Sequence, residues 1–158
     1  MNSIIFRERL WISSWISFLF ILLIGMITVV IVIQFFLNIP FGKEAPAAVL
    51  VGLDIFFIIL YLNFNRLLVE INPDRKIVKY GLIKRTVPIK DIVSCEPIRP
   101  SFGMYGGPGI RYGGDGSLAF ITSFGDAVEI RMESGRAFVF STNRREEVLK
   151  LLDRLMKP

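Results

Sequence analysis

The sequence predicts an α+β protein in which two apolar helices precede a β-rich domain, and three observations carry this prediction. The 158 residues are 53% hydrophobic with a mean hydropathy of +0.54, too apolar for an ordinary soluble domain of this size. Residues 1–64 hold three basic and three acidic side chains, whereas residues 65–158 hold the other sixteen basic and eleven acidic ones. At residue 65 the pattern changes from continuously apolar to alternating. The two regions are therefore expected to occupy different solvents, with a domain boundary between residues 64 and 65.

The first apolar run extends over Ile16–Leu37, and no charged residue lies between Arg9 and Lys43. Its 22 residues would form a helix of about 33 Å, enough to cross a hydrocarbon core of about 30 Å. Trp11 and Trp15 lie at its start, where amphipathic rings favour the headgroup level. The run predicts a transmembrane helix.

A second span is predicted over Ala47–Phe64, whose 18 residues give about 27 Å. The connecting segment, residues 38–46, contains the turn-forming residues Pro40, Gly42 and Pro46. Spans joined this closely must run antiparallel, and lipid forces them to be helical because it offers no partner for backbone polar groups. A cleaved signal peptide is the competing interpretation, but its apolar core is usually about 7–15 residues, shorter than this run.

The distribution of positive charge predicts the orientation. The connecting segment carries only Lys43, whereas Arg7 and Arg9 precede the first span and several basic residues follow the second. The positive-inside rule places both termini in the cytoplasm, with the chain as a multi-pass protein of the cell membrane. The lone Cys95 makes no intrachain disulfide and is compatible with that side.

Asp54 is the one charged residue within the predicted spans. Charges in lipid are costly and often mark function, so this position suggests either a structural or a transport role. In the structural interpretation, Asp54 faces Thr28 or Gln34 on the first helix, faces a water-filled groove, or contacts another subunit. In the alternative, the protein is an accessory subunit of a transporter or channel, with Asp54 in an intramembrane polar site.

Beyond residue 65, alternating apolar and polar residues predict about seven short antiparallel strands. These strands are expected at Leu67–Ile71, Ile77–Tyr80, Leu82–Val87, Ile89–Glu96, Leu118–Thr122, Ala127–Glu133 and Ala137–Ser141. A helix over Arg144–Met156 follows, with Asn143 as its predicted N-cap and an apolar stripe that includes Val148 and Leu152. The combination predicts a small curled barrel with its open end covered by the C-terminal helix.

Several stretches are similar to prokaryotic pleckstrin-homology-like domains. The strand–turn–strand unit around Asn72-Pro73-Asp74, the Tyr80-Gly81 pair and the stretch Val87–Ile92 resemble the start of such domains. Residues 106–111, 127–130 and 138–143 are similar to later parts. The resemblance covers about residues 66–156 and implies two packed antiparallel sheets with a C-terminal capping helix. Members of this superfamily bind phosphoinositides or proteins, but no ligand-binding residues carry over to this chain.

Two sets of residues are candidate contacts with a partner or with lipid. Basic residues follow soon after the second span, at Arg75, Lys76, Lys79, Lys84, Arg85 and Lys90. They suit an anionic membrane surface or, equally, an ordinary solvated face. Seven of the sixteen residues over Phe102–Ser117 are glycine. This stretch suggests a bulged loop, or a ligand loop in which Tyr105, Arg111 and Tyr112 supply the contacts.

Nothing in the sequence indicates an enzyme or a cofactor. The chain contains no histidine, and the glycine-rich stretch lacks the lysine of a phosphate-binding loop. Neither a small-molecule substrate nor nucleic acid is expected. The predicted function is a membrane-anchored interaction module at the cytoplasmic membrane surface. Its expected partners are membrane lipids, another membrane protein or further copies of the chain.

Overall fold

The computed structural model describes residues 4–36 and 47–157, apart from the side chains of residues 47, 76 and 77. The chain forms two compact units. One comprises residues 13–65 and is called the helical hairpin here. The other combines the N-terminal residues up to Ile12 with the chain from Arg66 onward and is called the β-unit.

The helical hairpin consists of α1 (Ser14–Phe36) and α2 (Ala47–Phe64), which pack against each other. The Phe20 and Tyr61 rings lie 5.8 Å apart between them. None of the side chains of α1 is buried, although almost all are apolar. Among the described residues, α1 is the one helix long and apolar enough to cross a membrane. The predicted turn over residues 38–46 and the end of the first run at Leu37 lie outside the described residues.

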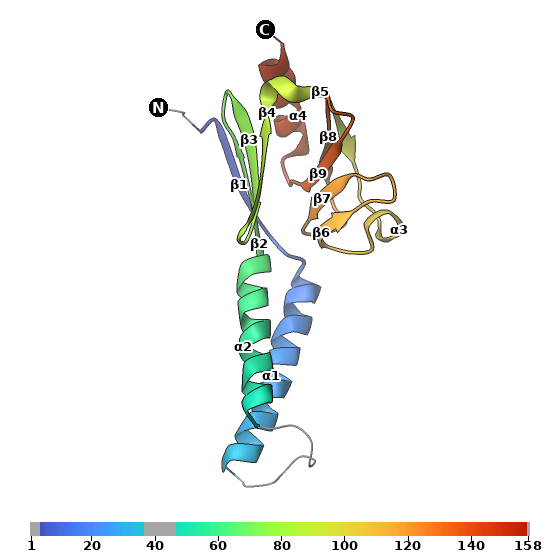
Figure 1. Cartoon of the computed structure of the whole chain (residues 1–158). Coiled ribbons are helices and arrows are strands. Elements are labelled where there is room, and N and C mark those ends of the chain that lie inside the picture. Colours follow the sequence, from blue (N-terminus) through green and yellow to red (C-terminus); the bar gives the residue numbers. More distant parts are fainter. Residues whose placement is uncertain (1–3, 37–46, 158) are drawn as a thin grey trace. The chain divides into compact units, whose positions relative to one another are not determined.

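Sheet A of the β-unit has four antiparallel strands in the order β1-β2-β3-β4. They are β1 (Phe6–Trp11), β2 (Arg66–Ile71), β3 (Arg75–Tyr80) and β4 (Ile83–Pro88). Strand β1 was not predicted. Trp11 at its end pairs with Arg66 at the start of β2, so the helical hairpin is inserted between two strands that pair with each other (Figure 1).

Sheet B has five strands in the order β5-β8-β9-β7-β6. They are β5 (Ile92–Ile98), β6 (Gly109–Tyr112), β7 (Leu118–Ile121), β8 (Ala127–Met132) and β9 (Ala137–Ser141). A single 3-10 turn, η1 (Ile89–Asp91), leads from β4 into β5.

The α+β prediction is confirmed, but two details of it are wrong. The strands form two separate sheets rather than one closed barrel, and β7 pairs with β9 in parallel rather than antiparallel. The parallel pairing arises because the β6–β7 hairpin, which lies between β5 and β8 in the sequence, adds in the sheet to the free side of β9. The described part of the chain accordingly contains nine strands instead of about seven.

The main core lies between the two sheets, which face each other in Figure 1. Tyr80 of sheet A meets Phe120 of sheet B with ring centroids 6.3 Å apart, and Phe138 stands 5.2 Å from Phe120. Sheet B is also buried on its opposite face. There Ala119, Ile121, Ala127 and Val139 form a second cluster with Tyr105. Burial on both faces explains why β9 reads as a continuous apolar run rather than an alternating one.

The C-terminal helix α4 (Arg145–Met156) packs against β5, β8 and η1. Val148 and Leu152 of the predicted stripe are buried. The predicted N-cap is wrong, because Arg144 occupies the cap position and no side chain caps the helix there. The backbone N–H of Asn143 instead donates a hydrogen bond to Glu8 of β1.

Candidate interaction sites

The predicted basic residues do not form a single surface. In the ladder between β3 and β4, Lys79 lies opposite Lys84, whereas Arg85 lies opposite the buried Val78. Because side chains alternate along a strand, Lys79 and Lys84 share the outer face of sheet A and Arg85 faces sheet B. Arg75 lies on the outer face at the start of β3, and Lys90 is exposed in η1. Lys76 pairs with Val87 in the ladder, and its side chain lies outside the described part.

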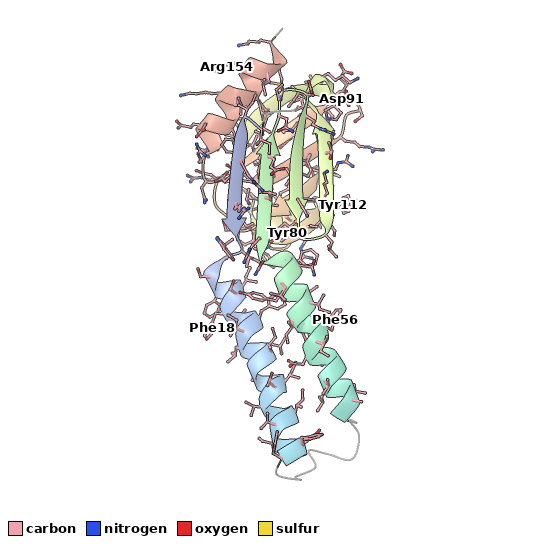
Figure 2. The ribbon with its side chains drawn as sticks, turned by 90° about the vertical axis from the view of Figure 1, so that its left-hand side faces the viewer. Phe18, Phe56, Tyr80, Asp91, Tyr112 and Arg154 are labelled. Atoms are coloured by element: carbon pink, nitrogen blue, oxygen red, sulfur yellow. The ribbon has the colours of Figure 1, made fainter. Side chains whose placement is uncertain are left out.

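The outer face of sheet A carries a larger basic surface than the sequence predicts, and Figure 2 views it with sheet B behind. Register adds residues from β1 and β2, because Arg9 pairs with Leu68 and Leu68 pairs with Lys79. The basic face, as it is called below, consists of Arg7, Arg9, Arg66, Arg75, Lys79 and Lys84. Glu70 is the acidic residue on the same face, and its carboxylate accepts from Arg7 at 3.0 Å.

Trp11 and Arg66 lie at the end of the basic face where the chain leaves β1 toward α1 and enters β2 after α2. The Arg66 guanidinium lies over the Trp11 ring, 4.3 Å from its centroid. This is the geometry of a cation–π contact. Sequence patterns do not predict this pair, because 54 residues separate two side chains that only the β1–β2 register brings together.

Arg85 enters a pocket of about 350 Å³ between the two sheets. Tyr112, Leu118, Arg136 and Phe138 also line this pocket. The Arg85 side chain is half-buried and its Nε is fully buried. The long aliphatic stem fills space beside apolar side chains, as is usual for arginines at the margin of a core. Arg85 therefore belongs to a different environment from its neighbour Lys84.

The glycine-rich stretch has defined secondary structure and packs on the outer face of sheet B through Tyr105. It forms the short helix α3 (Phe102–Tyr105) and then strand β6, with Gly106 in the left-handed conformation at the end of α3. Tyr105 is buried against the outer cluster of sheet B, so it is not available as the predicted contact. Arg111 and Tyr112 are exposed.

A network of three side chains closes the turn between β6 and β7. Asp115 Oδ1 accepts from the Ser117 hydroxyl at 2.6 Å and from its backbone N–H at 3.0 Å. The Ser117 hydroxyl lies 2.9 Å from the Tyr105 hydroxyl. The bonds from Ser117 lower the pKa of Asp115, whereas burial raises the pKa of Tyr105. The aspartate therefore remains an acceptor over the physiological range.

Gly113 is required by this turn for a steric reason. A Cβ built on it would lie 2.4 Å from Asp115 Oδ1, 2.7 Å from the Ser117 hydroxyl oxygen and 2.9 Å from the Tyr105 ring. The neighbouring Gly114 has open space around the same position. The first glycine thus serves the network, and the loop interpretation explains this stretch better than a ligand loop does.

Glu8 is a buried carboxylate that sequence reasoning missed. It accepts from the Thr142 hydroxyl at 2.5 Å and from the Asn143 backbone N–H at 3.0 Å. These bonds fasten the strand that precedes α1 to the segment that enters α4. A glutamate between two arginines at the start of an apolar run resembles an ordinary flanking charge, so nothing local distinguishes it.

The three polar residues that the sequence predicts within the spans are only partly brought together. The Thr28 hydroxyl lies 3.1 Å from Asp54 Oδ2 and 2.9 Å from the Ile24 carbonyl. Gln34 is half-buried, and no hydrogen bond joins its side chain to Asp54 within the described part of the hairpin. The contact with Thr28 gives Asp54 a partner within the chain.

No group of three or more side chains suited to hold a metal ion occurs in the described ranges. Comparisons of the chain with protein-family models, with curated proteins and with solved structures found no match.

Proposed function

We propose that this protein crosses a membrane twice and holds its β-unit at one membrane surface as an interaction module. The observation that carries the proposal is the pairing of β1 with β2 over their whole length. Strand β1 precedes α1 and strand β2 follows α2, so the pairing requires both to lie on the same side of the membrane. If α1 crosses, the chain must cross back before Arg66, because an odd number of crossings would separate the paired strands.

Helix α2 is the candidate for the return crossing. Its 18 residues give about 27 Å, which a slightly thinned bilayer accommodates. Its one charged side chain, Asp54, contacts Thr28 of α1. Hydrogen bonds of this kind between helices reduce the penalty of a polar group in lipid.

The distribution of arginines supports a cytoplasmic β-unit. Arg7 and Arg9 lie shortly before α1, and Arg66 lies two residues after the end of α2. The connecting segment between the helices holds only Lys43. By the positive-inside rule both termini then lie in the cytoplasm.

The β-unit supports an interaction function rather than a chemical one. Its open basic face and its exposed side chains, such as Phe102 beside Phe124, can contact partners. The arrangement of two sheets with a C-terminal helix is compatible with the resemblance to pleckstrin-homology-like domains, which we retain as part of the proposal. Asp54 Oδ1 is buried without a hydrogen-bond partner among the described residues, but Thr28 of the same hairpin contacts Asp54 Oδ2, and on this contact we favour the module over a transport subunit.

Cysteine labelling in cells tests the proposed topology. In a Cys95→Ser background, single cysteines replace Lys43 between the helices and Lys157 near the C-terminus. A membrane-impermeant maleimide should react with the Lys43→Cys variant in intact cells and with the Lys157→Cys variant only after permeabilisation. Equal behaviour of the two positions would mean one crossing or none, and would overturn the proposal.

A further inference from the structure

The whole net charge of the protein is concentrated on the basic face of sheet A. The chain carries 19 basic and 14 acidic residues. The outer face of sheet A holds six basic residues and one acidic residue, which is a net charge of +5. The remaining thirteen basic and thirteen acidic residues cancel. A surface this one-sided attracts anions and repels a second copy of itself.

Three of the cations on this face, Arg9, Lys79 and Lys84, are not neutralised by the protein. Lys79 and Lys84 are directly opposite each other, and Arg9 lies in the same row across Leu68. Like charges opposite each other on neighbouring strands destabilise a sheet. Among the described residues, the ion pairs leave Arg9, Lys79 and Lys84 without a carboxylate within 4.0 Å. An external anion would offset this repulsion.

The length of the chain limits how far these cations lie from the helical hairpin. Arg66 is two residues after the end of α2, and Arg9 is five residues before the start of α1. At about 3.4 Å per residue, Arg9 lies within about 17 Å of Ser14 along the chain. Lys79 is two strands away from Arg9, about 10 Å across the sheet.

The distance of at most about 17 Å between Arg9 and the start of α1 is comparable with the thickness of the headgroup layer plus the electrostatic screening length of about 8 Å. Trp11 and Arg66 lie closest to α1 and α2 in the sequence, and aromatic and arginine side chains are typical of the membrane interface. Arg75 lies at the opposite end of β3 from Tyr80, farther from the connections to the helices. An anionic leaflet would therefore attract Arg66, which lies opposite Trp11, and the next row of cations, which holds Arg9, Lys79 and Lys84.

We propose that Arg9, Arg66, Lys79 and Lys84 bind the anionic phospholipid headgroups of the membrane that holds the helical hairpin. This inference rests on the proposed function, because it requires α1 and α2 to lie in that membrane. Lipid phosphates satisfy the unpaired cations, and the tether keeps their effective concentration high even when each contact is weak.

Lysine labelling of the full chain in nanodiscs tests the proposal. The discs contain phosphatidylcholine alone or with about a third of phosphatidylglycerol, and an amine-reactive reagent is followed residue by residue by mass spectrometry. Lys79 and Lys84 should react about fivefold more slowly in the anionic discs, and raised salt should abolish the difference. Lys90 and Lys150 are exposed reference residues elsewhere in the β-unit and should change much less.

Two matched triple variants provide a second measurement, the number of phosphatidylglycerol molecules retained through purification in mild detergent. R9Q/K79Q/K84Q should retain clearly fewer than the unmodified chain. K90Q/K150Q/R154Q removes the same number of exposed charges and should retain as many as the unmodified chain.

Three results would overturn the proposal. Protection of Lys79 and Lys84 that is equal in both kinds of disc would exclude anionic headgroups. Protection that appears only after addition of polyglutamate would assign the face to an acidic protein, and protection that grows with protein concentration would assign it to a second copy. Insertion is checked first by flotation after an alkaline wash. A chain that fails to insert contradicts the proposed function as well, whereas an inserted chain without lipid-dependent protection contradicts only this inference.

Discussion

The helical hairpin and the β-unit use the same apolar residue types in opposite ways. Phe18 and Phe35 of α1 are 55% and 77% exposed, whereas Phe120, Phe138 and Phe140 of sheet B are at most 1% exposed. α1 is apolar on all sides, whereas α4 has one apolar stripe facing the sheet. Water tolerates the second arrangement and penalises the first, so α1 and α4 suit different solvents.

The largest effect should come from replacing a phenylalanine by alanine in each of the two units. Phe138→Ala removes the central ring of the core between the sheets and should lower the free energy of unfolding of the β-unit by about 3–5 kcal/mol. Phe18→Ala should leave that unfolding unchanged, because its ring is exposed on α1. Chemical denaturation in mild detergent, followed by near-ultraviolet circular dichroism, measures both. Equal losses for the two variants would contradict the division into units.

The attachment of β1 to the rest of the β-unit gives the next effect. Glu8→Ala leaves the Thr142 hydroxyl and the Asn143 N–H without their carboxylate, and should destabilise the β-unit by about 3 kcal/mol. Glu70→Ala breaks only the surface pair with Arg7 and should cost no more than about 1 kcal/mol. Hydrogen exchange of residues 6–11 should rise in the first variant alone. Unchanged exchange there would show that Glu8 does not hold β1.

A pH-dependent effect should be confined to the β-unit core. Burial raises the pKa of Tyr80 to about 12, whereas an unfolded tyrosine ionises near pH 10. The β-unit therefore keeps its full free energy of unfolding below pH 10 and loses part of it as the pH rises toward 12. At about 1.4 kcal/mol per pKa unit, the loss is about 2–3 kcal/mol. Tyr80→Phe should show a correspondingly smaller fall in stability between these pH values, and an identical fall would exclude Tyr80 as its source.

Two neighbouring glycines of the glycine-rich stretch should respond differently to the same substitution. Gly113→Ala should displace Asp115 and Ser117 and destabilise the β-unit by about 1–2 kcal/mol. Gly114→Ala has room for its methyl group and should be nearly neutral. Thermal unfolding of the two variants provides the comparison. Equal melting temperatures would contradict the steric role of Gly113.

The smallest effect is expected within the hairpin. Thr28→Val removes the hydroxyl beside Asp54 and should weaken the packing of α1 on α2 by about 0.6 kcal/mol. Thermal unfolding of the hairpin, reported by the fluorescence of Trp15, measures this change. Val29→Thr places a hydroxyl on the exposed side of α1 as a control. A loss of several kcal/mol in the Thr28 variant would indicate that Asp54 has a larger role than helix packing.

Periodicity was sufficient to predict most elements of this fold. Alternation located β2, β3 and β4, and the apolar stripe located α4, because each of these elements has one buried face. The uninterrupted apolar character of α1 and α2 predicted their helical form. These signals are local, and each follows directly from the solvent on either side of an element.

The unpredicted parts depend on contacts between distant residues. The pattern of β1 alternates, but its six residues adjoin a long apolar run. They can be identified as a strand only from their pairing with β2. The same pairing extends the basic face to Arg7 and Arg9. The parallel pairing of β7 with β9, and the burial of Tyr105 under the glycine-rich stretch, likewise depend on the register of sheet B. Spacing along the chain contains no information about such registers.

The most direct test of the account is a disulfide between the strands on either side of the helical hairpin. Arg9→Cys with Leu68→Cys in a Cys95→Ser chain places two thiols on cross-strand partners, at a Cα separation of about 5 Å that suits a disulfide. Mild oxidation in native membranes should link them rapidly, whereas Arg9→Cys with Thr86→Cys should stay reduced. Failure to link, together with labelling of the two positions from opposite sides of the membrane, would contradict the insertion of a two-pass hairpin between β1 and β2.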